Sequence, residues 1–316
     1  WTCSGFEVAF EGTGFSAELF ASVHDNADAC PYIGVLVDGA EQPADMQTIA
    51  VNQPGYAFYC LAEGLDPGPH RLKVVKLSEA QMSYIRLRSI RPEGGRMLPC
   101  PAPDYTLKME FIGDSITTGF GNLCPTKDGP FRTSEQDGWQ SYAAIAARKL
   151  DAEAHLICIS GYAVHKSPYG KAVPPLYPYV DGLQGCHIPW DFDRFQPDIV
   201  VINLGTNDGS WMVNEMSSHI PMQDKREQFI EAYRSFLHTV RGRNQQAKII
   251  CMIGMLNTVS IPDVEEAVRR AKADGLSEVY YLRLQEVPDY GAGHPGLRAH
   301  QVAAEALSTF INQIFL

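Results

Sequence analysis

The chain has 316 residues, 45% of them hydrophobic, and carries 26 basic and 37 acidic residues, which gives a formal net charge of −11. An acidic chain without a basic cluster is not expected to bind nucleic acid or an anionic membrane surface. No apolar run reaches the roughly 18 residues that a membrane-spanning helix needs. The length suits one large domain or two smaller ones.

The cysteines indicate a reducing environment. The chain has 8 cysteines, placed singly, with no CxxC pair and no zinc-like Cys/His spacing. We therefore expect reduced thiols, a cytoplasmic protein and no metal. The chain starts at Trp1 without a signal-peptide pattern, and secretion after removal of a leader stays the alternative. No phosphate loop or dinucleotide motif implies a cofactor.

Residues 1–104 alternate short apolar runs with turn signals such as Asp38-Gly39 and Asp66-Pro67-Gly68. Short strands at this spacing predict an all-β sandwich of jelly-roll type. A segment rich in proline and glycine, 91–105, reads as the linker that follows it. The expected strands are Phe6–Phe10, Phe15–Phe20, Tyr32–Val37, Tyr56–Leu61, Arg71–Leu77 and Tyr84–Ile90.

Residues 105–316 form the second predicted domain, in which continuous apolar runs alternate with helix-period segments. This pattern is typical of a parallel sheet with helices on both faces. The expected strands are Met109–Ile112, His155–Ile159, Ile199–Leu204, Lys248–Ile253 and Val279–Leu282. The expected helices are Trp139–Leu150, Asp224–Arg241, Asp263–Asp274 and Leu297–Ile314.

The sequence Gly113-Asp114-Ser115 directly follows the first of these strands. A serine at a helix start after a sharp glycine turn can expose its Oγ, which suits a nucleophile. An Asp/Ser helix cap without chemistry is the equally weighted alternative on this stretch alone. Gly161 and Asn207 each follow a later predicted strand. Because the carboxyl ends of parallel strands share one edge, we expect Ser115, Gly161 and Asn207 to meet there.

Four short blocks occur in order along the second domain: Gly113-Asp114-Ser115, Ser160-Gly161, Gly205-Thr206-Asn207-Asp208 and Gly293-His294. Their order and spacing resemble those of the SGNH (GDSL-type) hydrolases. The front domain, with Leu-Val-Asp-Gly at 36–39 and Val-Val-Lys-Leu-Ser-Glu-Ala at 74–80, makes the chain similar to carbohydrate esterase family 2. The resemblance implies a flavodoxin-like catalytic domain and a carbohydrate O-acetylesterase acting on acetylated plant polysaccharides or oligosaccharides, of xylan or mannan type and at the 6-hydroxyl.

The same resemblance implies a role for each block. Ser115 would attack the acetyl carbonyl, and His294 would act as base and then acid. The oxyanion would be held by the N–H groups of Ser115 and Gly161 and by the amide of Asn207. Asp208 reads as structural support. His300 is the rival for the base, although we expect it to cap or pack the last helix.

The chain departs from the usual pattern at the orienting acid. Most SGNH hydrolases have Asp three residues before the catalytic histidine, and here Gly291 stands at that position. Some family 2 esterases are thought to use a Ser-His dyad with a backbone carbonyl as the orienting group, and we predict the same arrangement here. Asp289 is the alternative orienting acid, if the segment Gly291-Ala292-Gly293 lets it reach back.

Aromatic residues suggest where a sugar would bind. The segment 162–194 is rich in Pro, Tyr and Gly, and loops of this length are usually functional or disordered. We predict Tyr162, Trp190 and Trp211 as substrate-binding residues, with packing against the front domain as the alternative for this loop. The front domain itself serves either as a wall of the cleft, which we favour, or as a carbohydrate-binding module.

Two other functions remain open. A lipid esterase or acyl-CoA thioesterase on the same scaffold would need a deep apolar acyl channel. A non-catalytic carbohydrate-binding protein would explain the missing Asp, although the four blocks argue against it. The expected partner is an acetylated carbohydrate, and the sequence leaves a monomer or a homo-oligomer open.

Overall fold

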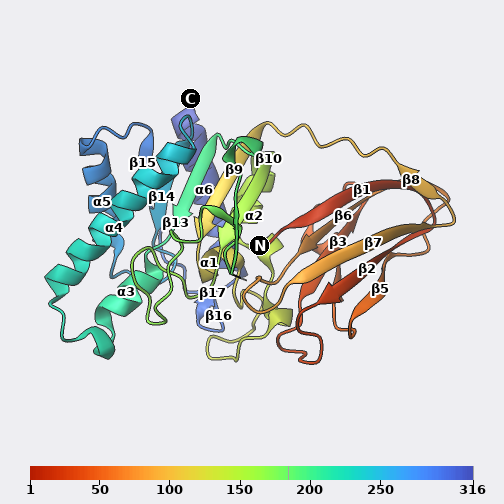
Figure 1. Cartoon of the computed structure of the whole chain (residues 1–316), viewed down its shortest axis with the longest axis horizontal. Helices are drawn as coiled ribbons and strands as arrows, with labels where there is room; N and C mark the ends of the chain where they lie inside the picture. The colour runs from red at the N-terminus through yellow and green to blue at the C-terminus, as the bar shows by residue number, and fades with distance from the viewer. Residues whose placement is uncertain (184, 316) are drawn as a thin grey trace.

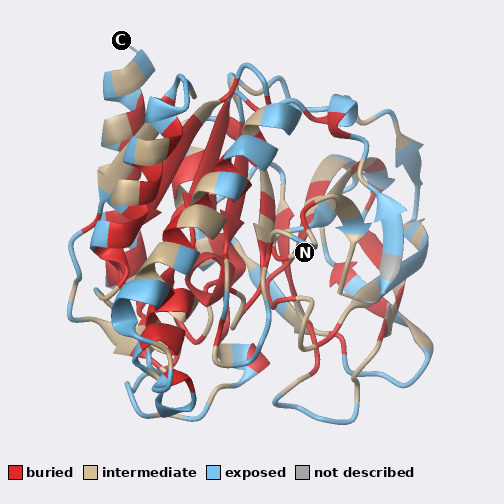
Figure 2. Ribbon diagram, turned by 60° about the vertical axis from the view of Figure 1, so that its left-hand side comes forward, coloured by how far each residue is buried: buried red, intermediate tan, exposed pale blue. Residues whose placement is uncertain are grey.

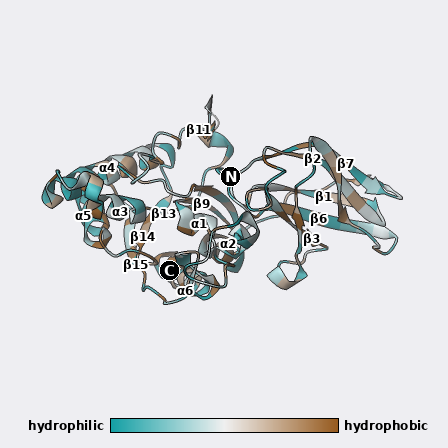
Figure 3. Cartoon of the chain, turned by 90° about the horizontal axis from the view of Figure 1, so that it is seen from below, coloured by the Kyte–Doolittle hydropathy of each residue, from teal (hydrophilic) through white to brown (hydrophobic). Residues whose placement is uncertain are grey.

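The structure is a computed structural model that describes residues 1–183 and 185–315. A β-rich unit at the N-terminal end lies beside an α/β unit (Figures 1 and 3). This two-domain architecture confirms the predicted fold class. Within the described residues no helix is long and apolar enough to cross a membrane.

The front unit is a sandwich of two antiparallel sheets. The first sheet has the order β4-β3-β6-β1-β8 and the second has the order β5-β2-β7. Their inner faces enclose an apolar core that includes Phe10, Phe15, Leu61 and Leu72, all of them buried. The strands are β1 (Gly5–Gly12), β2 (Gly14–Ala21), β3 (Tyr32–Val37), β4 (Gln47–Ala50), β5 (Tyr56–Ala62), β6 (Gly68–Lys76), β7 (Ile85–Glu93) and β8 (Arg96–Leu98).

Two of these strands were not expected. β4 consists of exposed or half-buried residues, so it lacks the apolar run that marks a core strand. β8 lies inside the predicted linker 91–105 and pairs with β1 over three residues. Both are edge strands, where only one side of the strand is paired, and edges carry a weak hydrophobic signal.

The second unit is built on a parallel sheet of order β10-β9-β13-β14-β15. In chain order this is 2-1-3-4-5, the flavodoxin-like arrangement, in which ligands bind where the order reverses. That point lies between β9 and its two neighbours, β10 and β13. The strands are β9 (Leu107–Gly113), β10 (Ala152–Cys158), β13 (Ile199–Asn203), β14 (Lys248–Ile253) and β15 (Val279–Arg283).

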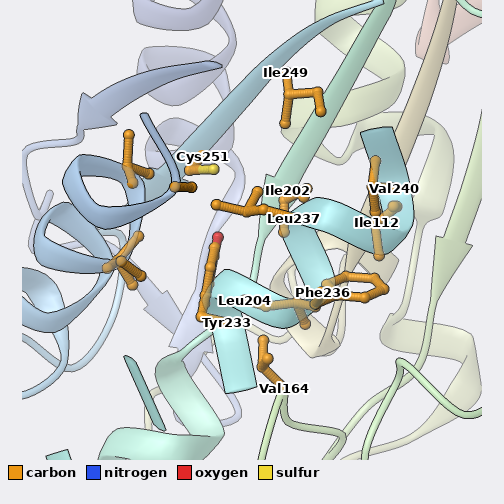
Figure 4. Packing of buried hydrophobic residues seen from close by; sticks show 14 of the residues in the cluster. Ile112, Val164, Ile202, Leu204, Tyr233, Phe236, Leu237, Val240, Ile249 and Cys251 are labelled. Carbon is orange, nitrogen blue, oxygen red and sulfur yellow. The ribbon is translucent and has the colours of Figure 1, made fainter. Parts of the chain in front are cut away.

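Helices cover both faces of this sheet. One face packs on α3, α4 and α5 and the other on α2 and α6. Figure 4 shows Ile202 and Ile249 of the sheet against Phe236 and Leu237 of α4, and Figure 2 shows the buried strands. The helices are α1 (Ser115–Thr118), α2 (Tyr142–Lys149), α3 (Thr206–Val213), α4 (Met222–Arg243), α5 (Ile261–Ala273) and α6 (Leu297–Phe315).

The long insert after β10 is folded on itself. It contains a short antiparallel hairpin of β11 (Tyr179–Asp181) and β12 (Cys186–Pro189). Tyr177 of this insert is buried and donates its hydroxyl hydrogen to Glu110 of β9 at 2.7 Å. The described part of the insert is thus anchored to the sheet through Tyr177.

Candidate active site

Three of the predicted site residues lie at the carboxyl edge of neighbouring strands. Gly113, the last residue of β9, pairs with Cys158 of β10 and with Asn203 of β13. Ser115, Gly161 and Asn207 follow these strand ends within a few residues. The structure therefore brings together at one edge the three residues that the strand argument placed there.

A tight strand-to-helix turn holds Ser115. A side chain on Gly113 would lie 2.0 Å from the hydroxyl of Thr117, so only glycine fits there. Asp114 precedes α1 and its carboxylate accepts the N–H of Ile116 at 3.0 Å. The capping alternative is therefore correct for Asp114. Ser115 itself is free to present its hydroxyl elsewhere, because the cap belongs to its neighbour.

His294 reaches Ser115 from a short hairpin of β16 (Tyr290–Gly291) and β17 (His294–Pro295). The two residues between the strands, Ala292 and Gly293, have φ of 49° and 75°, the sign of φ found in type I′ turns. Nε2 of His294 lies 2.9 Å from Ser115 Oγ, and Nδ1 lies 3.2 Å from the carbonyl oxygen of Ala292. A proton on Nδ1 shared with that carbonyl leaves the Nε2 lone pair facing the serine hydroxyl.

Asp289 caps the start of α6 instead of orienting His294. Its carboxylate accepts the N–H groups of Arg298 at 2.7 Å and Ala299 at 3.2 Å, at the start of α6. The Gly-Ala-Gly segment does not act as a flexible arm, because it forms the hairpin turn. The structure thus places the carbonyl of Ala292, and not the carboxylate of Asp289, beside Nδ1 of His294.

The surroundings of His294 favour its neutral form. Burial lowers the pKa of the imidazole below its usual value, and the hydrogen bond to the Ala292 carbonyl partly opposes this. The ring of Phe120 lies 4.5 Å from the imidazole centroid and stacks on Phe131 at 3.8 Å. A neutral imidazole at pH 7 can accept a proton, which a general base requires.

His300 lies away from the serine. It is buried on α6, and its Nδ1 accepts the backbone N–H of Tyr142 at 3.0 Å. Burial lowers its pKa to about 4. As expected from the sequence, this residue packs the last helix, here against the start of α2.

The candidate oxyanion donors follow neighbouring strand ends, and one of them, the Asn207 amide, is hydrogen-bonded to nearby groups. Gly161 has φ of 80°, in the left-handed region that favours glycine. The side-chain amide of Asn207 donates to the carbonyl of Tyr162 at 2.9 Å and to Asp114 at 3.3 Å. The contact of the Asn207 amide with Asp114 is the longer and weaker of the two, so the hydrogen that makes it is the one available to a ligand.

Asp208 supports the loop after Gly161. Its two carboxylate oxygens accept the backbone N–H groups of Val164, His165 and Lys166. Burial raises the pKa of Asp208 to about 6, against the effect of these hydrogen bonds. The structural role expected for Asp208 agrees with these contacts.

The three predicted substrate-binding aromatics are dispersed. Trp190 lines a cavity of about 640 Å³ between the two domains, and none of Ser115, Gly161, Asn207 and His294 lines it. Trp211 is 9% exposed and packs in the core, so it offers no open ring face to a sugar. This corrects the expectation for Trp211, which sits on the inner side of α3. Tyr162 is half-buried beside Gly161 with Lys171 over its ring.

Sequence reasoning missed other side chains around the site. Tyr169 is 71% exposed, and its ring lies 3.1 Å from where a Cβ on Gly161 would be. Phe120 lies against His294, and Phe131 stacks on Phe120. Phe120 follows the serine block directly, so its position was a usable signal, whereas Phe131 and Tyr169 lie in loops without a pattern. Among the described residues no group of three or more His, Cys, Asp and Glu could hold a metal ion.

Comparison with known proteins matches both halves of the chain. The carbohydrate esterase 2 N-terminal model matches residues 1–101, and that of the GDSL-like lipase/acylhydrolase family matches residues 111–293. The cellulase/esterase CelE of Acetivibrio thermocellus is 33% identical over 98% of this chain, which spans only 37% of that protein. An acetylxylan esterase/glucomannan deacetylase of Cellvibrio japonicus is 26% identical over 99% of this chain and 84% of its own length.

Solved structures give the same result. A family two carbohydrate esterase from Clostridium thermocellum, in complex with cellohexaose, superposes with a TM-score of 0.87 at 29% identity. The match covers 100% of this chain and 93% of that one. The chain is thus a member of the GDSL-like lipase/acylhydrolase family and, with its N-terminal domain, belongs to carbohydrate esterase family 2.

Proposed function

We propose that this protein is a carbohydrate O-acetylesterase that works by Ser-His nucleophilic catalysis through an acetyl-enzyme. The observation that carries the proposal is the 2.9 Å contact between Ser115 Oγ and Nε2 of His294, a half-buried imidazole whose pKa is lowered by its surroundings. A nucleophile within hydrogen-bond distance of an oriented base is the arrangement that acyl transfer needs.

In the first half of the reaction, Nε2 of His294 removes the hydroxyl proton as Ser115 Oγ bonds to the acetyl carbon. The carbonyl oxygen becomes an oxyanion, held by the N–H groups of Ser115 and Gly161 and by the Asn207 hydrogen that otherwise contacts Asp114 at 3.3 Å. The Ala292 carbonyl stabilises the imidazolium through Nδ1–H. The ester bond then breaks, and the imidazolium protonates the departing sugar oxygen.

In the second half, a water molecule gives a proton to Nε2 of His294 and attacks the acetyl carbon bound to Ser115. The same donors hold the second oxyanion. Its collapse breaks the bond to Ser115 Oγ, which takes the proton back from the imidazolium, and acetate leaves. A carbonyl lends the imidazolium less charge than a carboxylate would, but an ester is easier to cleave than an amide.

For the substrate we propose acetylated xylan or mannan chains, or their oligosaccharides, with the exposed 6-O-acetyl group as the target. The proposal is supported by the relatives, which are named as acetylxylan esterase and glucomannan deacetylase. An exposed aromatic ring, Tyr169, stands beside Gly161, where a sugar face could stack.

Wild-type protein is expected to release acetate from nitrophenyl acetate and from acetylated xylo- or manno-oligosaccharides, and to cleave nitrophenyl octanoate much more slowly. The physical reason is that the cavity of about 640 Å³ between the domains is not lined by Ser115 or His294, so it does not offer the serine an acyl channel. Comparing kcat/KM for the two nitrophenyl esters checks acyl length, and NMR of the product reports which hydroxyl was freed. Preference for octanoate would favour the lipid esterase, and binding of sugar without acetate release would favour the non-catalytic protein.

Replacing Asp289 with Ala is expected to leave kcat close to the wild-type value while lowering stability. The carboxylate accepts two N–H groups at the start of α6, and losing such a cap costs about 1 kcal/mol. Thermal unfolding and initial rates below the melting temperature separate the two effects. Asp289→Asn, which keeps an acceptor oxygen, should recover part of the stability. Abolished turnover in a folded Asp289→Ala protein would make Asp289 the orienting acid.

A further inference from the structure

The connection between β6 and β7, residues 77–84, passes from the front domain into the α/β domain. Leu77 packs with Trp139, which precedes α2, and its carbonyl accepts the N–H of Gly138 at 2.9 Å. Ser78 and Glu79, the next two residues, have no exposed surface. A segment of the front domain is therefore buried against the α/β domain.

Glu79 contacts the loop that carries the candidate oxyanion donor. Its Oε2 accepts the backbone N–H of Ser160 at 2.9 Å, one residue before Gly161. Its own N–H donates to Oε1 of Gln136 at 3.2 Å, and Nε2 of Gln136 donates to the carbonyl of Thr118 in α1 at 3.3 Å. Glu79 thus binds the Gly161 loop directly and the Ser115 helix through one side chain.

We propose that Glu79 is a positioning residue for the oxyanion hole, supplied by the front domain. The inference rests on the proposed function, since it concerns the donor role of Gly161. The carboxylate fixes the peptide plane before Ser160, and Gly161 then turns at φ of 80°. Because Glu79 holds the Ser160 N–H, the next N–H, that of Gly161, is the one that remains for an oxyanion. The front domain then does more than form a wall of the cleft.

The cost of placing a carboxylate here supports a specific role. A buried carboxylate loses its hydration, and the other oxygen of Glu79, Oε1, has no hydrogen-bond partner in the described structure. Burial raises the pKa of Glu79, while its hydrogen bonds to Ser160 and the charge of Lys76 oppose that rise. Lys76 is itself buried and donates to Ser78. If position 79 served only packing, an apolar side chain would fill the same space without the cost of removing a carboxylate from water.

The test compares Glu79→Ala, Glu79→Gln and wild type in the full chain. Glu79→Ala is expected to lower kcat on the order of 10- to 100-fold with little change in KM, because a displaced donor costs somewhat less than a deleted one. Glu79→Gln keeps an oxygen that accepts the Ser160 N–H and should recover most of the rate. Hydrogen exchange of the Ser160 amide should be faster in Glu79→Ala and return toward wild type in Glu79→Gln.

Glu93→Ala is the matched control, since Glu93 accepts the hydroxyl of Ser16 inside the front domain. It should change neither kcat nor exchange at Ser160. Wild-type kcat in folded Glu79→Ala, or unchanged exchange at Ser160, would overturn the proposal. Failure of the proposed function can be told apart from failure of this inference. In the first case wild type releases no acetate, and hydrogen exchange at Ser160 still reports whether Glu79 holds the loop.

Discussion

Replacing Ser115 with Ala is expected to reduce acetate release on the order of 10⁴-fold or more, to the background of the assay. The hydroxyl is the atom that bonds to the acetyl carbon, and its 2.9 Å contact with Nε2 of His294 gives it a base. The alanine fits the same turn, so the fold should survive. Initial rates on nitrophenyl acetate and on acetylated oligosaccharides, with thermal unfolding of both proteins, measure the effect.

Ser134, which is exposed, provides the matched control. Ser134→Ala should retain wild-type turnover. A fluorophosphonate should label wild type and Ser134→Ala but not Ser115→Ala, and the mass shift should map to Ser115. Turnover that persists in a folded Ser115→Ala protein would show that another group attacks the ester.

Replacing His294 with Ala is expected to lower kcat/KM on the order of 10⁴-fold, the upper end for loss of a general acid-base group. His294 is the side chain that contacts the Ser115 hydroxyl through a basic nitrogen, and His300 does not replace it, since its Nδ1 is bonded to the Tyr142 N–H. The rate on an activated ester with a good leaving group should fall less than the rate on an acetylated sugar, because only the sugar oxygen needs protonation as it leaves.

The pH profile provides the second measurement for His294. Burial lowers the pKa of this imidazole, so wild type should lose kcat/KM on acidification with a midpoint below pH 6.5. Activity is present above that midpoint because the base is then neutral. His219 is exposed, and His219→Ala should leave the profile unchanged. An acid limb centred above pH 6.5, or the same limb in His294→Ala, would identify a different base.

Much of the α/β domain follows from the sequence. The central strands β13 and β14 are runs of Val, Ile and other apolar residues, because they are covered on both faces, and such runs are visible without knowledge of the partners. The parallel arrangement then places the ends of β9, β10 and β13 at one edge. That argument brought Ser115, Gly161 and Asn207 together before any contact was known.

The sequence was less informative where partners are distant along the chain. The sequence shows that Trp211 and Trp190 are aromatic but not where they lie. Packing places Trp211 in the core and Trp190 at the cavity between the domains. The helix α3 was missed because it follows its strand directly and has no long apolar period. Glu79 belonged to a recognisable stretch of the front domain, yet nothing local indicates that it contacts Ser160.

The sequence by itself determined the fold class and the order of the four blocks, and it predicted Ser115 as nucleophile and His294 as base, because periodicity and block order can be read without knowledge of the packing. The tertiary structure decided what orients the histidine. Ala292 and Gly293 turn with positive φ, so Nδ1 of His294 meets a carbonyl, while Asp289 is used by the amides of α6. Buried N–H and C=O groups must find hydrogen-bond partners in the folded interior. Which partner each group finds depends on segments that are distant in the sequence and meet only on folding.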